Sequence, residues 1–318
     1  MKFFAGFLLV SLLGIHSTSF AAGMPQDPFY CKYFKCKVSK AFICNTIQVR
    51  SHPLQYCFMS PSRFENSQPL WTHVKFDKKR PILPLLYFHG AGASNITAQE
   101  TTFYRATWDV LERDGRAPLP ILLTFGPTWF LSRDPNYYSV DDLMNIALPV
   151  ILTHIRLADS GIVLDHQVAL LGGSMGGHNT LQVYMNYPER VKAATAFCSA
   201  VAELPPGATP EDIQAYIQRT GATPDIARQM PGIVRPSYVN DEAFWRDNLL
   251  TLITTKTSLP PLWANYDDQD DFGFNATNPD LLNQMNGKSN PLIVTHAPGR
   301  HCQGTLDHLM DGYDFINR

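Results

Sequence analysis

The chain has 318 residues, which is enough for one large domain or two small ones, and 45% of them are hydrophobic. Its 26 basic and 28 acidic residues give a net charge of −2, and no run of like charges stands out. This balanced charge disfavours nucleic acid and an anionic membrane surface as partners.

Residues 1–21 have the pattern of a signal peptide. Lys2 supplies a positive charge, residues 3–15 are almost entirely apolar, and Ser19-Phe20-Ala21 places small residues on both sides of a cleavage motif. The apolar run is shorter than the roughly 20 residues that a membrane span needs, so we expect no span here. The mature chain is therefore expected to be secreted or periplasmic.

Residues 22–80 are predicted to form a cysteine-rich extension ahead of the main domain, which we expect to cover residues 81–318. The six cysteines are Cys31, Cys36, Cys44, Cys57, Cys198 and Cys302. In an exported chain we expect the four in the extension to form two disulfides, whose pairing the sequence leaves open. Zinc is the less favoured alternative, because no C-x-x-C pair or histidine cluster is present.

From residue 81 onward, apolar runs alternate with helical patterns. The predicted strands span residues 82–88, 120–125, 168–171, 193–197, 261–265 and 292–295, and the predicted helices span residues 98–113, 141–156, 179–187 and 305 to the C-terminus. This alternation is typical of an α/β fold with a mostly parallel sheet that helices cover on both faces. In such a sheet, ligands bind at the carboxyl ends of the strands.

Residues 203–256 interrupt the alternation. They begin with Pro205-Pro206-Gly207 and continue with a helical pattern. This insertion is compatible with a lid over a site and equally with a long crossover that has helices of its own.

The turn after the predicted strand 168–171 carries a G-x-S-x-G pattern at Gly172, Ser174 and Gly176. A tight turn from strand to helix exposes the serine hydroxyl, and it needs small neighbours because the strand and the helix nearly touch. We therefore predict that Ser174 is a nucleophile. The alternative is an ordinary glycine-rich loop that contains a serine.

A serine nucleophile needs a base that removes its proton. His301 is the predicted base, because it lies in the loop after the last strand, at the same edge of the sheet as Ser174. His89 and His178 lie in glycine-rich turns and are expected to shape those turns through hydrogen bonds. Cys302 adjoins His301, so a disulfide from Cys302 to Cys198 would stiffen the loop that carries the base.

The base needs a carboxylate that orients it, and the loop after the strand 261–265 offers four. They are Asp267, Asp268, Asp270 and Asp271. In this type of sheet the acid comes between the serine and the histidine along the chain, as these residues do. A solvated turn and a calcium site are the alternatives for so acidic a loop.

Two backbone N–H groups are expected to stabilise an oxyanion. One belongs to Met175, which follows the predicted nucleophile, and the other to Ala91 in the glycine-rich turn His89-Gly90-Ala91-Gly92. The alternative for that turn is a plain link between a strand and a helix.

An aromatic loop follows the strand 120–125. Its residues Trp129, Tyr137 and Tyr138 could form the wall of a substrate pocket, although aromatic residues of a loop are as often packed inside.

Four motifs in chain order, HGAG, GGSMGG, DDQDDFGF and PGRH, resemble those of α/β-hydrolases. More narrowly, they resemble the putative-esterase family that includes feruloyl, acetyl-xylan and enterochelin esterases, S-formylglutathione hydrolase and mycolyltransferases. The resemblance runs from about residue 82 to the C-terminus. Through the D-x-x-G-F run that begins at Asp270, it implies a triad of Ser174, His301 and Asp270.

Together with the predicted signal peptide, the resemblance implies a secreted serine esterase that needs no metal or cofactor and acts on a small-molecule or polysaccharide-linked ester. An acyltransferase or a peptidase could use the same triad. A non-catalytic binding protein on a hydrolase scaffold is the alternative from another class. The sequence predicts neither the acyl and alcohol specificity nor the oligomeric state.

Overall fold

The computed structural model describes residues 40–68, 74–92, 100–303 and 309–318. The predicted signal peptide, Cys31 and Cys36 lie outside these residues. Across the described parts of the chain, every helix is too short or too polar to cross a membrane.

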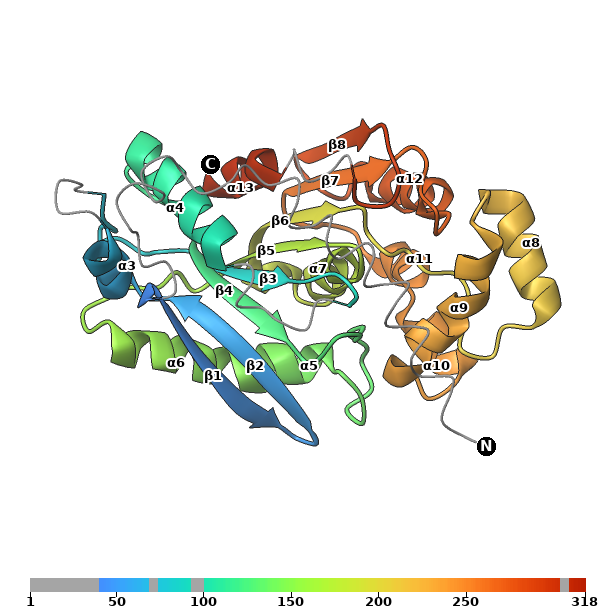
Figure 1. Cartoon of the computed structure of the whole chain (residues 1–318), viewed down its shortest axis with the longest axis horizontal. Coiled ribbons are helices and arrows are strands. Elements are labelled where there is room, and N and C mark those ends of the chain that lie inside the picture. The colour runs from blue at the N-terminus through green and yellow to red at the C-terminus, as the bar shows by residue number, and fades with distance from the viewer. Residues whose placement is uncertain (1–39, 69–73, 93–99, 304–308) are drawn as a thin grey trace.

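Eight strands form one sheet in the order β1-β2-β4-β3-β5-β6-β7-β8 (Figure 1). Their bounds are β1 Phe42–Val49, β2 His52–Met59, β3 Pro84–Phe88, β4 Leu119–Thr124, β5 Val168–Gly173, β6 Val191–Phe197, β7 Leu262–Asp267 and β8 Leu292–Ala297. Strands β3 to β8 are parallel, whereas β2 runs antiparallel to both β1 and β4. The prediction of a mostly parallel sheet is confirmed, and each predicted apolar run overlaps one of the strands β3 to β8.

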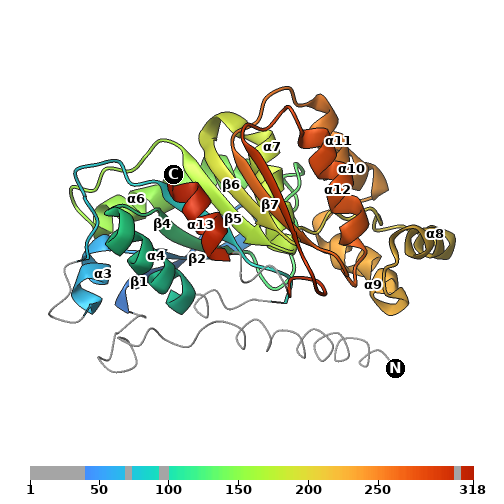
Figure 2. The ribbon, with the colours of Figure 1, turned by 90° about the horizontal axis from the view of Figure 1, so that it is seen from above.

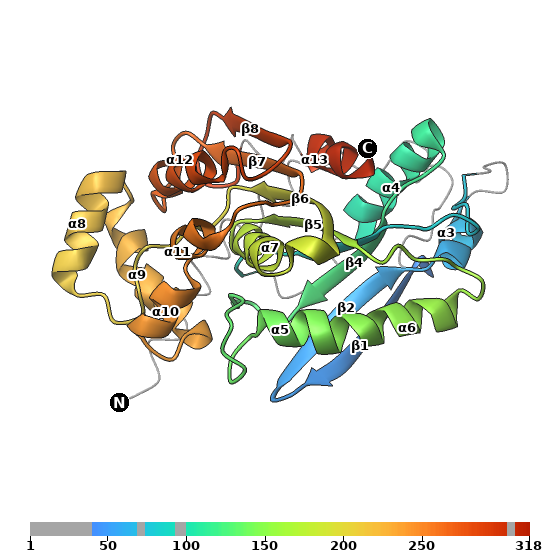
Figure 3. The same cartoon turned by 180° about the vertical axis from the view of Figure 1, so that it is seen from behind.

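Helices cover both faces of this sheet, as predicted. Their bounds are α3 Pro61–Ser67, α4 Glu100–Asp114, α5 Val140–Asp142, α6 Leu148–Ala158, α7 Met175–Asn186, α12 Phe274–Met285 and α13 Leu309–Asn317, with a π-helical turn at Leu143–Ala147. Helices α4 and α13 lie on one face, and α6 and α7 lie on the other (Figures 2 and 3). Because both faces are covered, every residue of β3, β4 and β5 is buried.

The prediction that residues 22–80 lie outside the main domain needs a correction. The hairpin of β1 and β2 comes from this segment and extends the central sheet, and it contributes Leu54, Tyr56 and Phe58 to the core. A disulfide joins Cys44 to Cys57, which are paired opposite one another in the hairpin. This disulfide therefore links two neighbouring strands of the sheet and does not connect a separate extension to the main domain.

The insertion at residues 203–256 is helical. It contains α8 Pro210–Thr220, α9 Pro224–Val234, α10 Asp241–Asp247 and α11 Leu249–Leu252. Helices α8 to α10 lie beyond the carboxyl ends of the parallel strands (Figure 1).

Hydrogen bonds join the insertion to two loops at the carboxyl edge of the sheet. The buried carboxylate of Asp247 accepts hydrogen bonds from the backbone and the guanidinium of Arg133 in the aromatic loop, each at 2.9 Å. The Tyr216 hydroxyl donates to the Phe272 carbonyl in the acidic loop at 2.7 Å. These contacts favour a packed crossover over a freely moving lid.

Candidate active site

Ser174 occupies the single-residue turn between β5 and α7. Its backbone has φ 57° and ψ −122°, in the region of positive φ that residues with a side chain rarely adopt. Its N–H donates to the Phe197 carbonyl of β6 at 3.1 Å, and its carbonyl accepts the Ala200 N–H at 2.9 Å. Such strain is typical of functional sites, where the surrounding structure holds the residue in place.

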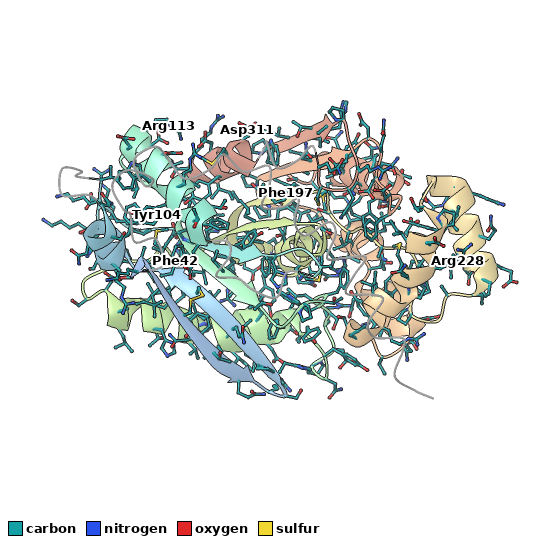
Figure 4. The ribbon with its side chains drawn as sticks, viewed as in Figure 1. Phe42, Tyr104, Arg113, Phe197, Arg228 and Asp311 are labelled. Atoms are coloured by element: carbon teal, nitrogen blue, oxygen red, sulfur yellow. A yellow bond between two sulfur atoms is a disulfide. The ribbon has the colours of Figure 1, made fainter. Side chains whose placement is uncertain are left out.

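The glycines of the G-x-S-x-G pattern are required by close backbone approach. A Cβ on Gly172 would lie 2.3 Å from the Gly176 carbonyl oxygen, and one on Gly176 would lie 1.9 Å from the Phe88 carbonyl oxygen. Gly173 lies against the ring of Phe197, which is labelled in Figure 4, and a Cβ there would come within 2.1 Å of that ring. A larger residue at Gly172 or Gly176 would push α7 away from the sheet, and one at Gly173 would clash with the Phe197 ring of β6.

The structure brings together Ser174, His301 and Asp270 from three different loops at the carboxyl edge. The Nε2 atom of His301 lies 2.8 Å from the Ser174 Oγ, and its Nδ1 atom lies 2.6 Å from Oδ2 of Asp270. Because an ionised carboxylate can only accept, Nδ1 carries the proton in the neutral imidazole. Nε2 is then free to accept the serine proton.

Among the four candidate aspartates, Asp270 is the one that contacts Nδ1 of His301. Asp268 pairs with His296 at 3.1 Å, Asp271 lies 3.9 Å from Arg300, and Asp267 accepts the Cys302 N–H at 2.6 Å. The Asp270 side chain is 1% exposed, and its second oxygen accepts the Phe272 N–H at 2.8 Å. Both oxygens are thus held, which fixes the direction in which the carboxylate faces the imidazole.

Aromatic rings and a disulfide surround the imidazole. The rings of Phe272 and Phe274 lie 4.6 and 5.6 Å from the His301 ring, measured between centroids. A disulfide joins Cys302 to Cys198, which directly follows β6. The loop that carries His301 is therefore tied covalently to the neighbourhood of the serine turn.

The glycine-rich turn after β3 passes beside the serine. A Cβ on Gly90 would lie 3.5 Å from the Ser174 Cβ, and the Gly92 N–H donates to the Pro127 carbonyl at 2.7 Å. Ala91 lies between these two glycines, while Met175 begins α7 directly after the serine. The two predicted oxyanion donors therefore belong to segments that flank Ser174.

His89 shapes that turn through hydrogen bonds, as predicted. Its Nδ1 atom lies 2.7 Å from the Gly90 carbonyl, and its Nε2 atom accepts the indole N–H of Trp129 at 3.1 Å. The Thr124 hydroxyl lies 2.6 Å from the same Nε2 atom. Burial lowers the pKa of His89 to about 4, so the ring is neutral and bears its proton on Nδ1. The contact of Thr124 with His89 could not be predicted from the sequence, because Thr124 is simply the last residue of an apolar strand.

The prediction that Trp129 could form part of the wall of a substrate pocket needs a correction. Its side chain is fully buried, where it supports His89 and packs against Phe125 and Tyr138, so it offers no accessible surface to a substrate. Tyr137 and Tyr138 are partly exposed and remain candidates for that wall.

Two buried histidines predict that the fold is sensitive to acid. Burial lowers the pKa of His178, like that of His89, to about 4 from an ordinary 6.5. Below about pH 6.5 each of these histidines is protonated in the unfolded chain but stays neutral in the folded protein. The free energy of unfolding therefore falls as the pH drops towards 4. For one histidine we expect a loss of roughly 2 to 3 kcal/mol between about pH 7 and 4.5.

Urea unfolding at these two pH values would measure that loss. His178→Gln should reduce the difference between the two free energies of unfolding. His166→Gln is the matched control, because His166 is 88% exposed and should leave the difference unchanged. An equal difference in wild type and His178→Gln would contradict this explanation.

No family model matches the chain, and the comparison with curated proteins found no match. Solved structures are similar in fold. The thermophilic carboxylesterase EstE1, cloned from a metagenomic library, has a TM-score of 0.62 and 15% identity, over 96% of this chain and 96% of its own. A ferulic acid esterase has a TM-score of 0.55 and 16% identity, over 86% of this chain and 97% of its own.

An S-formylglutathione hydrolase from Agrobacterium tumefaciens has a TM-score of 0.54 and 11% identity, over 87% of this chain and 92% of its own. At such low identity the likeness shows the fold alone. Together with the strand order and the helices on both faces, it shows that the chain has the α/β-hydrolase fold.

Proposed function

We propose that this α/β-hydrolase-fold chain is a secreted or periplasmic serine esterase that hydrolyses carboxylic esters. The observation that supports the proposal most is the hydrogen-bonded series from the Ser174 hydroxyl through His301 to Asp270. Two disulfides among the described residues, Cys44–Cys57 and Cys198–Cys302, are compatible with an oxidising compartment.

Acylation begins when the Ser174 oxygen attacks the ester carbonyl and the Nε2 atom of His301 takes the hydroxyl proton. Asp270 keeps the imidazole in the required tautomer and stabilises the imidazolium that forms. The backbone N–H groups of Ala91 and Met175 donate to the oxyanion of the tetrahedral intermediate. Collapse of this intermediate expels the alcohol, which takes its proton from His301.

Deacylation repeats these steps with water as the nucleophile. His301 accepts a proton from the water as it attacks the acyl-enzyme, and the second tetrahedral intermediate uses the same two N–H donors. Its collapse releases the carboxylic acid and returns the proton to Ser174. The same triad and the same two N–H donors thus serve both half-reactions.

A small-molecule ester or an ester linked to a polysaccharide is the proposed substrate. Tyr137 and Tyr138 support an acyl or sugar group with an apolar face, because both are partly exposed in the loop after β4. An acyltransferase and a peptidase remain alternatives that the same triad could serve, since a fold does not determine the reaction.

A substrate panel separates these reactions. The panel contains p-nitrophenyl esters of short to long acyl chains, methyl esters of aromatic acids, and matched anilides, each with and without an added alcohol. We expect esters to turn over faster than anilides. The free acid should be the main product, because a hydrolase passes the acyl group to water. Ser174→Ala, measured in parallel, gives the background rate.

Other outcomes would replace the proposal. Mainly transesterified product would indicate an acyltransferase, and faster anilide cleavage would indicate a peptidase. A folded wild type with no turnover and no covalent labelling of its serine would indicate a binding protein.

A further inference from the structure

Cys302, the residue after the proposed base, has a backbone conformation that needs support. Its φ is 58°, in the left-handed region that a residue with a side chain adopts when its surroundings hold it there. Two independent attachments hold Cys302: one through its backbone N–H and one through its sulfur. Because His301 directly precedes Cys302, a shift of the Cys302 backbone would displace the backbone that carries the imidazole.

The first attachment is a second buried carboxylate. Asp267 ends β7, is 0% exposed, and accepts the Cys302 N–H through Oδ2 at 2.6 Å. This distance is at the short end of the range for an N–H···O hydrogen bond. Asp267 and Asp270 are three residues apart, and their carboxylates lie within 4.8 Å of each other and of a His301 ring nitrogen. The end of β7 and the loop that follows it thus hold both the imidazole of His301 and the backbone of Cys302.

The second attachment leads back to the nucleophile. The disulfide partner Cys198 donates its N–H to the Asn265 carbonyl of β7 at 2.7 Å. The preceding residue, Phe197, accepts the Ser174 N–H at 3.1 Å. A short path of covalent and hydrogen bonds therefore connects the serine turn to the loop that carries His301.

We infer that Asp267 is a positioning residue for His301, which it holds through Cys302 together with the Cys198–Cys302 disulfide. The inference rests on the proposed function. A base must lie within hydrogen-bond reach of the hydroxyl, and a displacement of about 1 Å can cost roughly 100-fold in rate. Without its acceptor, the Cys302 backbone would lose the hydrogen bond that stabilises its positive φ.

The kinetic test compares two substitutions of Asp267. Asp267→Ala should lower kcat roughly 10- to 100-fold and leave KM within about twofold, because the ester binds but the base is displaced. Asp267→Asn should recover most of kcat, since its side-chain oxygen can still accept the Cys302 N–H. Asn265→Ala is the control, because it keeps the backbone carbonyl that accepts the Cys198 N–H and removes only a buried side chain on the same side of β7, which donates to Thr295.

A second measurement does not depend on turnover. The Nδ1 proton of His301, shared with Asp270, should give a low-field proton NMR resonance that His301→Gln removes. We expect the resonance in the wild type, Asp267→Asn and Asn265→Ala, and its loss or broadening in Asp267→Ala. If Asp267→Ala does not fold, the double variant Cys198→Ser/Cys302→Ser takes its place, with the same two readouts expected to change.

An unchanged kcat together with an unchanged resonance in Asp267→Ala would overturn the inference. So would an Asn265→Ala variant that loses as much kcat as Asp267→Ala, because general destabilisation would then explain both. A wild type without ester turnover would refute the proposed function, and the resonance would still decide whether Asp267 positions His301. Absence of the resonance from the wild type would contradict the hydrogen bond from which the inference starts.

Discussion

Ser174→Ala is expected to lower kcat for an ester substrate by roughly 10⁵- to 10⁶-fold, because the attacking oxygen is gone. Alanine keeps the Cβ that the turn already accommodates at φ 57°, so the fold should survive. Steady-state kinetics with a p-nitrophenyl ester, combined with thermal unfolding, would measure both effects.

Ser199→Ala is the matched control for this loss. Ser199 is a buried serine in the loop after β6, and the proposed mechanism gives it no role. We expect its kcat to stay within about twofold of the wild type. A Ser174→Ala variant that retains a tenth or more of the activity would show that another group is the nucleophile.

Asp270→Asn should give the next largest effect, a loss of roughly 10⁴-fold in kcat with little change in stability. The amide has the shape of the carboxylate, but its NH₂ group would face Nδ1 of His301 and favour the tautomer with the proton on Nε2. That nitrogen could then no longer accept the serine proton. The measurement is the same ester assay across a range of pH.

Asp268→Asn provides the comparison within the same loop. Asp268 is 46% exposed and pairs with His296, so we expect a change in kcat of no more than about twofold. Equal losses in the two variants, or a larger loss in Asp268→Asn, would assign the orienting role to a different carboxylate.

The six parallel strands and the serine turn could be predicted from the sequence because each depends on residues that are close together along the chain. A strand covered on both faces needs a continuous apolar run, and such runs stand out at β3, β4 and β5. The glycines around Ser174 stand out because backbone approach leaves no room for a side chain. Since parallel strands end at one edge, the order of motifs also placed His301 near the serine.

The β1–β2 hairpin could not be predicted in the same way. Strand β1 lies at the edge of the sheet, and its middle residues are largely exposed, so its sequence FICNTIQV lacks the apolar run of a buried strand. The nearby cysteines suggested a separate extension, whereas Cys44 and Cys57 face each other inside the hairpin. The place of the hairpin in the sheet depends on the pairing of β2 with β4, which is far away in sequence.

Within the site, spacing alone could not choose among four aspartates, because the conformation of the acidic loop decides which one faces the imidazole. The D-x-x-G-F resemblance selected Asp270, and the structure places that carboxylate 2.6 Å from Nδ1 of His301. The burial of Trp129 could not be predicted either, since it depends on contacts with His89 and Phe125 from two other segments.

The most direct test of the central claim is covalent labelling with a fluorophosphonate, followed by mass spectrometry of the digested protein. The proposed mechanism predicts one adduct, on Ser174, that forms rapidly in the wild type, much more slowly in His301→Ala, and not at all in Ser174→Ala. Equal labelling of wild type and Ser174→Ala, or an adduct on another residue, would contradict it.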